Sequence, residues 1–219
     1  MVDFKCHCKY CRVYNFLWLL DDEMVWVEIP KNGSAGLKST RFGYVVKVDK
    51  NGIVPLSEDS RLKPLPRLNP ARYKKGFFIL RDPVERFKSI FAYFFGYGGA
   101  RAYLGHEWLM RNDLFVSKNF KDYKNLSHED KLDLIFDNWE LMANFEGVHH
   151  FNSQASFIPD EFDKLEQKMI FEMKHLSPIF GFEEKINVSN SASIVLKPHQ
   201  EYLVKEYYSE DYDLIRKYL

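Results

Sequence analysis

A short apolar strand followed by a loop and a helix start occurs twice in this sequence, and this pattern restricts the fold more than any other feature. The first copy is the β-prone run Met24–Ile29, which is ended by Pro30 and followed by a segment able to start a helix at Ala35. The second copy is Gly76–Leu80, which is followed by Asp82-Pro83, an N-cap residue with proline at the first helical position. Strands that alternate with helices predict an α/β fold with a parallel sheet.

The other elements are predicted from turn residues and from periodicity. Asn51-Gly52 lies between two β-prone runs, Tyr44–Asp49 and Ile53–Leu56, which predicts a small hairpin or two strand fragments. The stretch Gly52–Tyr73 is rich in proline and is predicted to be an extended loop.

Three further helices are predicted in the second half of the chain. Ser127 caps the first, whose inner face is Leu132, Ile135, Phe136, Trp139 and Met142. The second lies within Gln167–Leu176, and the third covers Pro198–Leu219 with a break near Ser209.

The charge balance excludes two classes of partner. The 219 residues include 31 basic and 31 acidic side chains, so no global field attracts nucleic acid or an anionic membrane, and an anion site has to be local. No run reaches the roughly 18 apolar residues of a membrane span. We therefore expect a cytoplasmic protein without a membrane span or a secretory signal.

All three cysteines, Cys6, Cys8 and Cys11, lie in one short stretch, and an odd number favours a reducing compartment. With His7 they could ligate zinc, but structural zinc sites draw their ligands from two separated pairs, and no second pair follows. We therefore expect residues 1–22 to form an N-terminal segment, residues 23–219 to form one domain, and no metal to be required.

The loop after the first strand, Pro30–Leu37, has the composition of a phosphate cradle. Lys31 provides a cation, Gly33 and Gly36 let the backbone approach a ligand, and a helix start offers N–H groups. The loop is not a Walker A motif, because Leu37 and not glycine precedes Lys38. The alternative interpretation is a plain structural turn.

The loop after the second strand offers a guanidinium and a hydroxyl. Arg81 leaves the strand and Ser89 follows two helical turns into the helix, so that both can face the strand end. Such a pair suits a terminal phosphate. The alternative is that Arg81 pairs with Asp82 or Glu85 and that Ser89 merely packs.

Together the two loops resemble those of the sulfotransferases that use 3′-phosphoadenosine 5′-phosphosulfate, in particular the carbohydrate sulfotransferases and their bacterial relatives. Ile29–Ser34 is similar to the family's 5′-phosphosulfate loop, and Leu80–Ser89 to its 3′-phosphate segment. His150–Gln154 is similar to its H-x-x-x-Q segment, and Asn187–Ser191 and Tyr207–Leu219 to its late loop and closing helix.

The resemblance implies a P-loop-like three-layer fold, with a central parallel sheet flanked by helices and a strand near Phe162–Leu165 that a helix follows. It implies that 3′-phosphoadenosine 5′-phosphosulfate is the cofactor and that the acceptor carries a hydroxyl, on a glycan. The implied cofactor-binding residues are Lys31, Asn32, Gly33, Ser34, Ala35, Gly36, Arg81 and Ser89. Ala35 and Gly36 replace two hydroxyl residues of the family, which predicts weaker cofactor affinity.

In sulfuryl transfer, negative charge develops on the oxygen that links the sulfuryl group to the departing nucleotide, and Lys31 is placed to stabilise this charge. The attacking hydroxyl also needs a base. Relatives use glutamate or histidine as the base. Glu58 and Asp59 are the clustered acids between the two loops, and His149 and His150 are the alternatives. We choose His150, because it lies in a segment that the resemblance marks.

Two other functions stay open. One is a P-loop nucleotide or phosphotransfer kinase, although the Walker A loop is absent. The other is a non-catalytic glycan- or nucleotide-binding protein of the same fold, which detectable turnover would exclude.

Overall fold

The fold is described from a computed structural model, which covers residues 16–20, 24–33, 37, 46–49, 52–55, 62–96, 99, 101–145, 148–176 and 190–219. Three sets of predictions lie outside these residues: Cys6, Cys8 and Cys11; Ser34, Ala35 and Gly36; and Glu58 and Asp59.

Contacts between residues divide the chain into two compact units. The sheet unit comprises the described residues of Arg12–Arg81, Ser153–Asn187 and Glu210–Leu219. The helical unit comprises those of Asp82–Asn152 and Val188–Ser209. Each unit is described by itself, and the single domain expected from residue 23 stays a prediction.

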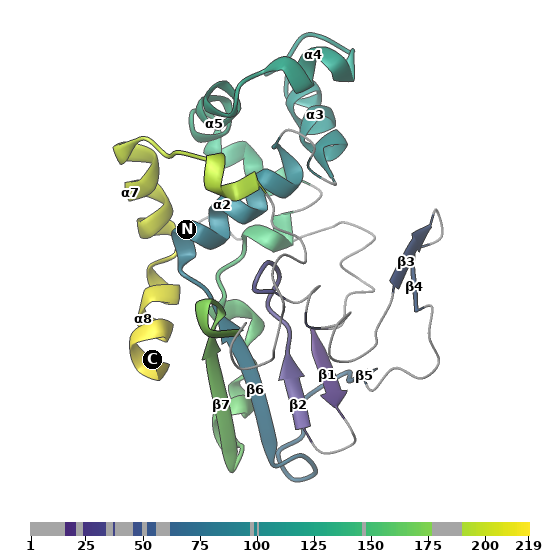
Figure 1. The fold of residues 1–219 in the computed structure, drawn as a ribbon, viewed down its shortest axis with the longest axis vertical. Coiled ribbons are helices and arrows are strands. Elements are labelled where there is room, and N and C mark those ends of the chain that lie inside the picture. Colours follow the sequence, from purple (N-terminus) through teal and green to yellow (C-terminus); the bar gives the residue numbers. More distant parts are fainter. Residues whose placement is uncertain are drawn as a thin grey trace. The chain divides into compact units, whose positions relative to one another are not determined.

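The sheet unit is built on a five-stranded mixed sheet in the order β5-β1-β2-β6-β7 (Figure 1). Its strands are β1 (Leu17–Leu20), β2 (Met24–Val27), β5 (Leu62–Pro64), β6 (Lys75–Leu80) and β7 (Gln167–Glu172). β2, β6 and β7 are parallel neighbours, whereas β1 runs antiparallel to both β2 and β5. The two strands predicted around the candidate loops are thus confirmed, and they are adjacent.

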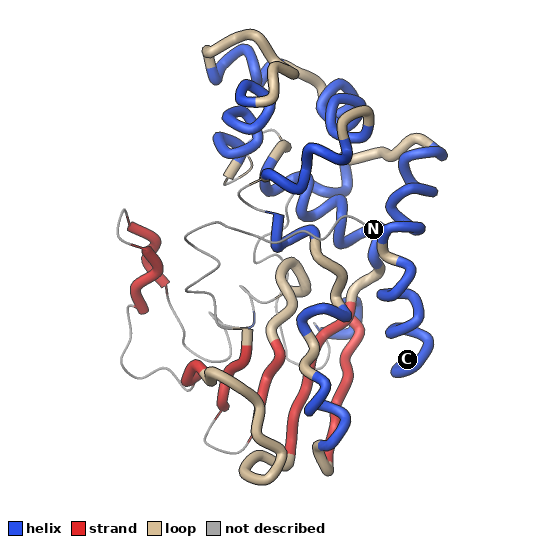
Figure 2. Tube along the Cα trace, turned by 180° about the vertical axis from the view of Figure 1, so that it is seen from behind, coloured by secondary structure: helices blue, strands red, loops and turns tan. Residues whose placement is uncertain are grey.

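Both faces of this sheet are apolar, as in parallel sheets covered on two sides. On β6, Phe77 and Ile79 contribute to one core cluster, and Phe78 and Leu80 to the other. One face is covered by the helical segments η3 (Ala155–Phe157) and η4 (Asp160–Lys164) and by α8 (Ser209–Tyr218), which contribute Phe157, Phe162, Leu214, Ile215 and Tyr218. Figure 2 shows helical turns in front of the red strands.

Two predictions for the segment 160–176 are wrong. Phe162 lies in η4 and not in a strand, and β7 with the short turn η5 (Met173–His175) replaces the helix predicted within Gln167–Leu176. The resemblance implied the strand near Phe162, and apolar residues at helical spacing caused the second error. All six residues of β7 pair in parallel with β6, and this sheet pairing outweighs the local periodicity.

Two strands near the start of the chain, β1 and β5, were missed. β1 lies in the segment 1–22, and its Trp18 and Leu19 are buried in the sheet unit. The predicted loop Gly52–Tyr73 contains β5 and also β4 (Gly52–Pro55). The predicted hairpin is confirmed, because β4 pairs antiparallel with β3 (Val46–Asp49).

The helical unit contains α2 (Pro83–Phe94), α3 (Ala102–Arg111), α4 (Phe120–Asn125), α5 (His128–Phe136) and α7 (Pro198–Tyr207), with the short turns η1 (Trp139–Asn144), η2 (Val148–Phe151) and η6 (Asn190–Ser193). The predicted caps are confirmed. Asp82 accepts from the backbone of Glu85, and Ser127 forms a capping box with Asp130. The predicted break near Ser209 separates α7 from α8.

Aromatic side chains fill the core of the helical unit, where Phe87, Phe91, Phe94, Phe95, Tyr123, Phe145 and Phe151 are all buried. α3 packs closely against α2 at Gly105, where an added Cβ would lie 2.4 Å from the backbone oxygen of Phe94. The α/β class is therefore confirmed. Among the described residues, no helix is long and apolar enough to cross a membrane.

Candidate functional site

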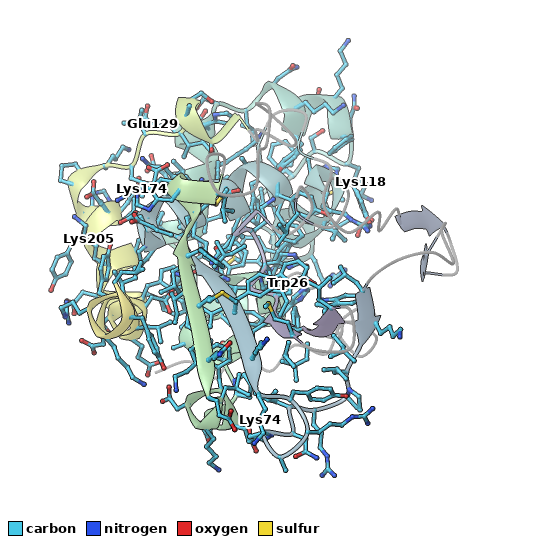
Figure 3. The ribbon with its side chains drawn as sticks, turned by 60° about the horizontal axis from the view of Figure 1, so that its bottom comes forward. Trp26, Lys74, Lys118, Glu129, Lys174 and Lys205 are labelled. Carbon is cyan, nitrogen blue, oxygen red and sulfur yellow. The ribbon has the colours of Figure 1, made fainter. Side chains whose placement is uncertain are left out.

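The candidate site lies in the sheet unit, at the edge where its parallel strands end. Val27 of β2 pairs in register with Phe78 of β6, and Leu80 of β6 with Glu172 of β7, so the loops that follow these strands leave at the same edge. Figure 3 shows Lys74, which precedes β6, and Lys174, which follows β7, at opposite ends of the strands. Ligands of open α/β sheets bind beyond the carboxyl ends of such strands.

The loop after β2 begins with a tight turn. The backbone N–H of Asn32 donates to Ile29 O (3.2 Å), Pro30 is the second residue of the turn, and Lys31 is the third, with φ of 68°. Proline at the second position and positive φ at the third define a type II turn. Glycine or asparagine normally occupies that third position, and the left-handed conformation costs other residues about 1 to 2 kcal/mol.

Gly33 continues this unusual backbone, with φ of 79°. The backbone conformation therefore favours glycine, and the space is tight as well, because a Cβ at this position would lie 3.1 Å from Leu176 Cδ1. Asn32, between Lys31 and Gly33, does not share their positive φ. Alternating handedness of this kind turns successive N–H groups toward one side and is typical of backbone anion sites.

The side chain of Asn32 points into the protein and not outward. It is 1 % exposed, and its Nδ2 donates to Ile79 O and to Gln154 Oε1, both at 2.6 Å. Its Oδ1 is buried and has no hydrogen-bond partner in the part of the chain that the structure describes. The predicted contribution of Asn32 to cofactor binding would therefore be made through the loop that it holds.

Gln154 connects this loop to the end of β6. Its Oε1 accepts from the backbone N–H of Arg81 (3.0 Å) as well as from Asn32, and its Nε2 donates to Arg81 O (2.8 Å). The amide thus pairs with both polar backbone groups of Arg81, as a neighbouring strand would. Gln154 itself is fully buried.

The guanidinium of Arg81 closes a ring of hydrogen bonds. Its Nη1 donates to Lys31 O (3.1 Å), the carbonyl of the residue with positive φ. The ring passes through Lys31, Asn32, Gln154 and Arg81, and its members are two cations and two amides without a carboxylate. The half-buried Arg81 uses one of its five N–H donors in this bond. This donor set fits an anion.

The acidic residues near the ring in sequence have partners of their own. Glu28, which precedes Lys31 by three residues, is buried and accepts from Trp18 Nε1 (2.7 Å). At the end of β7, Lys174 pairs with Glu172 at 2.7 Å, on the surface. The residues suggested as alternative partners of Arg81 have other bonds: Asp82 caps α2, and Glu85 pairs with Lys88 (2.9 Å).

Ser89 and His150 belong to the helical unit. Ser89 is buried on α2, and the half-buried His150 stacks on Tyr93 and lies edge-on to Phe94, with ring centroids 6.0 and 5.0 Å apart. The buried His149 has its pKa lowered to about 4, by burial first and by the charge of Arg86 second. His149 is therefore neutral at neutral pH.

Arg86 is a residue whose importance the sequence does not indicate. It is fully buried, and its Nη1 and Nη2 donate to Asn152 O (2.8 Å) and His150 O (2.9 Å). Its guanidinium also lies over the ring of Tyr208, 5.8 Å from the centroid. The sequence also marked the segment that contains Gln154, but gave this residue no role.

No family model, curated protein or solved structure matches this chain significantly. The described residues contain no group of three or more histidine, cysteine or acidic side chains placed to hold a metal ion. The function is therefore argued from the ring and its neighbours.

Proposed function

We propose that this protein is a sulfotransferase that binds 3′-phosphoadenosine 5′-phosphosulfate and modifies a hydroxyl group of a carbohydrate. The observation that carries the proposal is the ring at the ends of β2 and β6, where two loops with the family's motifs are hydrogen-bonded to each other through Lys31, Arg81 and Gln154. The proposal includes the finer fold, a P-loop-like three-layer arrangement. The odd number of cysteines supports a cytoplasmic location.

The ring fits the anionic groups of this cofactor. Lys31 and Arg81 are cationic, and the alternating backbone of Lys31–Gly33 is typical of loops that bind phosphate through N–H groups. When bound, the cofactor would supply an activated sulfuryl group. The residues of this chain would bind its phosphates, and Lys31 would stabilise the charge that develops on the leaving group.

Ser89 as a ligand of the 3′-phosphate and His150 as the base are further parts of the proposal. A neutral imidazole can accept the proton of the attacking hydroxyl. We expect His150→Ala to lower turnover by roughly a hundredfold or more, while leaving nucleotide affinity nearly unchanged. Steady-state kinetics together with calorimetry check this, and full activity of the variant would contradict the role of His150.

The proposal is tested by comparing nucleotides that differ in one phosphate. We expect 3′-phosphoadenosine 5′-phosphate to raise the melting temperature in the presence of a chelator, and to bind at least about tenfold more tightly than AMP. Equal affinity for the two nucleotides would contradict the proposal. Tight binding without sulfuryl transfer to any of a panel of oligosaccharides would instead indicate a non-catalytic binding protein.

A further inference from the structure

Gln154 occupies the one position in the ring from which a single side chain contacts both loops. Its side chain accepts a hydrogen bond from Asn32 Nδ2 in the loop after β2. It also pairs with the N–H and C=O of Arg81 at the end of β6. These partners lie 122 and 73 residues away along the chain. Without Gln154, one hydrogen bond of the ring would remain, from Arg81 to Lys31, together with the bond from Asn32 to Ile79 outside the ring.

We propose that Gln154 is a positioning residue that holds Lys31 and Arg81 together as one anion-binding group. The inference rests on the proposed function for the identity of the ligand, but not for the role of the ring. Gln154 is fully buried, so its action on a ligand is indirect, through the groups that it orients.

The geometry explains why an amide is needed at this position. Arg81 presents a donor and an acceptor side by side, and a primary amide meets both at once. An ionised carboxylate would place an oxygen against Arg81 O, whereas an apolar side chain would leave both backbone groups without this partner. Because Gln154 fixes the backbone of Arg81, it also fixes the position from which the Arg81 side chain extends. The guanidinium of this side chain donates to Lys31 O.

The ring also stabilises the strained turn at Lys31. Lys31 has positive φ at a turn position where glycine is usual. Two hydrogen bonds hold this turn in place, one from Arg81 to the carbonyl of Lys31 and one from Asn32 to Gln154. Such strain persists only where the surrounding structure enforces it. Loss of Gln154 should therefore loosen both cationic groups together.

The test compares two buried glutamines. Gln154→Met removes the amide at similar length, and Gln200→Met is the matched control. Gln200 is 1 % exposed, accepts from Lys197 N (3.0 Å) and donates to Asp133 Oδ1 (2.9 Å), but it belongs to the helical unit and not to the ring. Both substitutions should lower the melting temperature, because both remove a buried hydrogen-bonded amide.

Calorimetry of the full chain with two probes, pyrophosphate and 3′-phosphoadenosine 5′-phosphate, separates a positioning role from a structural one. We expect Gln154→Met to lower the affinity for both probes at least tenfold. Gln200→Met should change these affinities less than twofold. A folded Gln154→Met protein with unchanged affinities would overturn the inference and leave the proposed function standing. If pyrophosphate binding depends on Gln154 but the nucleotide binds no better than AMP, the proposed function fails and the inference stands. Absence of binding of either probe to the unmodified protein would overturn both.

Gln154→Glu keeps the experiment decisive if the methionine variant does not fold. A protonated carboxyl group can again donate to Arg81 O, and an ionised one cannot. We therefore expect the affinity of this variant for pyrophosphate, relative to the unmodified protein, to recover as the pH falls through the titration of the new carboxyl group. A ratio that does not change with pH would contradict the inference.

Discussion

Two arginines five positions apart, Arg81 and Arg86, show how tertiary structure gives the same side chain different uses. Arg86 is fully buried, and both of its terminal nitrogens donate to backbone carbonyls of the segment that carries His150. Arg81 is half-buried and donates through Nη1 to the carbonyl of Lys31. A buried arginine whose donors are bound to backbone carbonyls stabilises the fold. An arginine at the partly exposed end of a strand can bind an anion.

The largest expected effect is on stability, from Arg86→Met. The change leaves the carbonyls of His150 and Asn152 without these donors in a buried region, so we expect a loss of about 3 to 5 kcal/mol in the free energy of unfolding. Urea denaturation followed by circular dichroism measures it. Lys88→Met on the same helix breaks the surface pair with Glu85, and the free energy of unfolding should stay within about 0.5 kcal/mol of the unmodified protein. Similar losses of unfolding free energy for both variants would contradict the claim that Arg86 stabilises the fold more than Lys88 does.

Arg81→Gln should show the opposite pattern. The nucleotide would lose its charged, forked partner, which predicts a loss of about 2 to 4 kcal/mol in the binding free energy of 3′-phosphoadenosine 5′-phosphate. The free energy of unfolding should fall less, by about 1 kcal/mol for the hydrogen bond to Lys31 O that is removed. Calorimetry and denaturation measure the two quantities. Normal binding by this variant would place the phosphate site elsewhere.

The pH dependence of stability reports on the surroundings of Arg86. Burial and the charge of Arg86 lower the pKa of His149 to about 4, below the value of about 6.5 expected in the unfolded chain. Between these values the unfolded state binds the proton more tightly, so acidification destabilises the fold, by about 2 kcal/mol from pH 7 to pH 4.5. Denaturation at several pH values measures this loss. It should shrink in His149→Gln, and an unchanged slope would show that His149 is not responsible.

The smallest effect concerns the turn that Arg81 holds. Lys31→Gly removes the charge and suits the positive φ, whereas Lys31→Ala removes the charge and keeps the strain. We expect the glycine variant to be more stable than the alanine variant by about 1 kcal/mol. Both should bind 3′-phosphoadenosine 5′-phosphate more weakly than the unmodified protein. Equal unfolding free energies for the two variants would mean that the turn stores no strain.

The sequence alone determined the features that depend on near neighbours. Pro30 marks the end of the first strand, Asp82-Pro83 and Ser127 mark helix starts, and Asn51-Gly52 marks a hairpin, because each acts on residues within about four positions. The same local signals located both candidate loops. They misled at β7, whose apolar residues also fit a helix, and in the proline-rich stretch that contains β5.

Tertiary structure decided what depends on distant partners. β1 has four residues and becomes a strand by pairing with β2 and β5, and β7 does so by pairing with β6. Gln154 joins the ring by reaching residues 73 and 122 positions away, and nothing in its own neighbourhood indicates those partners. The sequence singled out Arg81 by its place after the strand, but it did not indicate the different surroundings of Arg86 and Arg81. Burial and hydrogen bonding across the fold separate them, because the surroundings of a side chain are set by packing between segments that are distant in the chain.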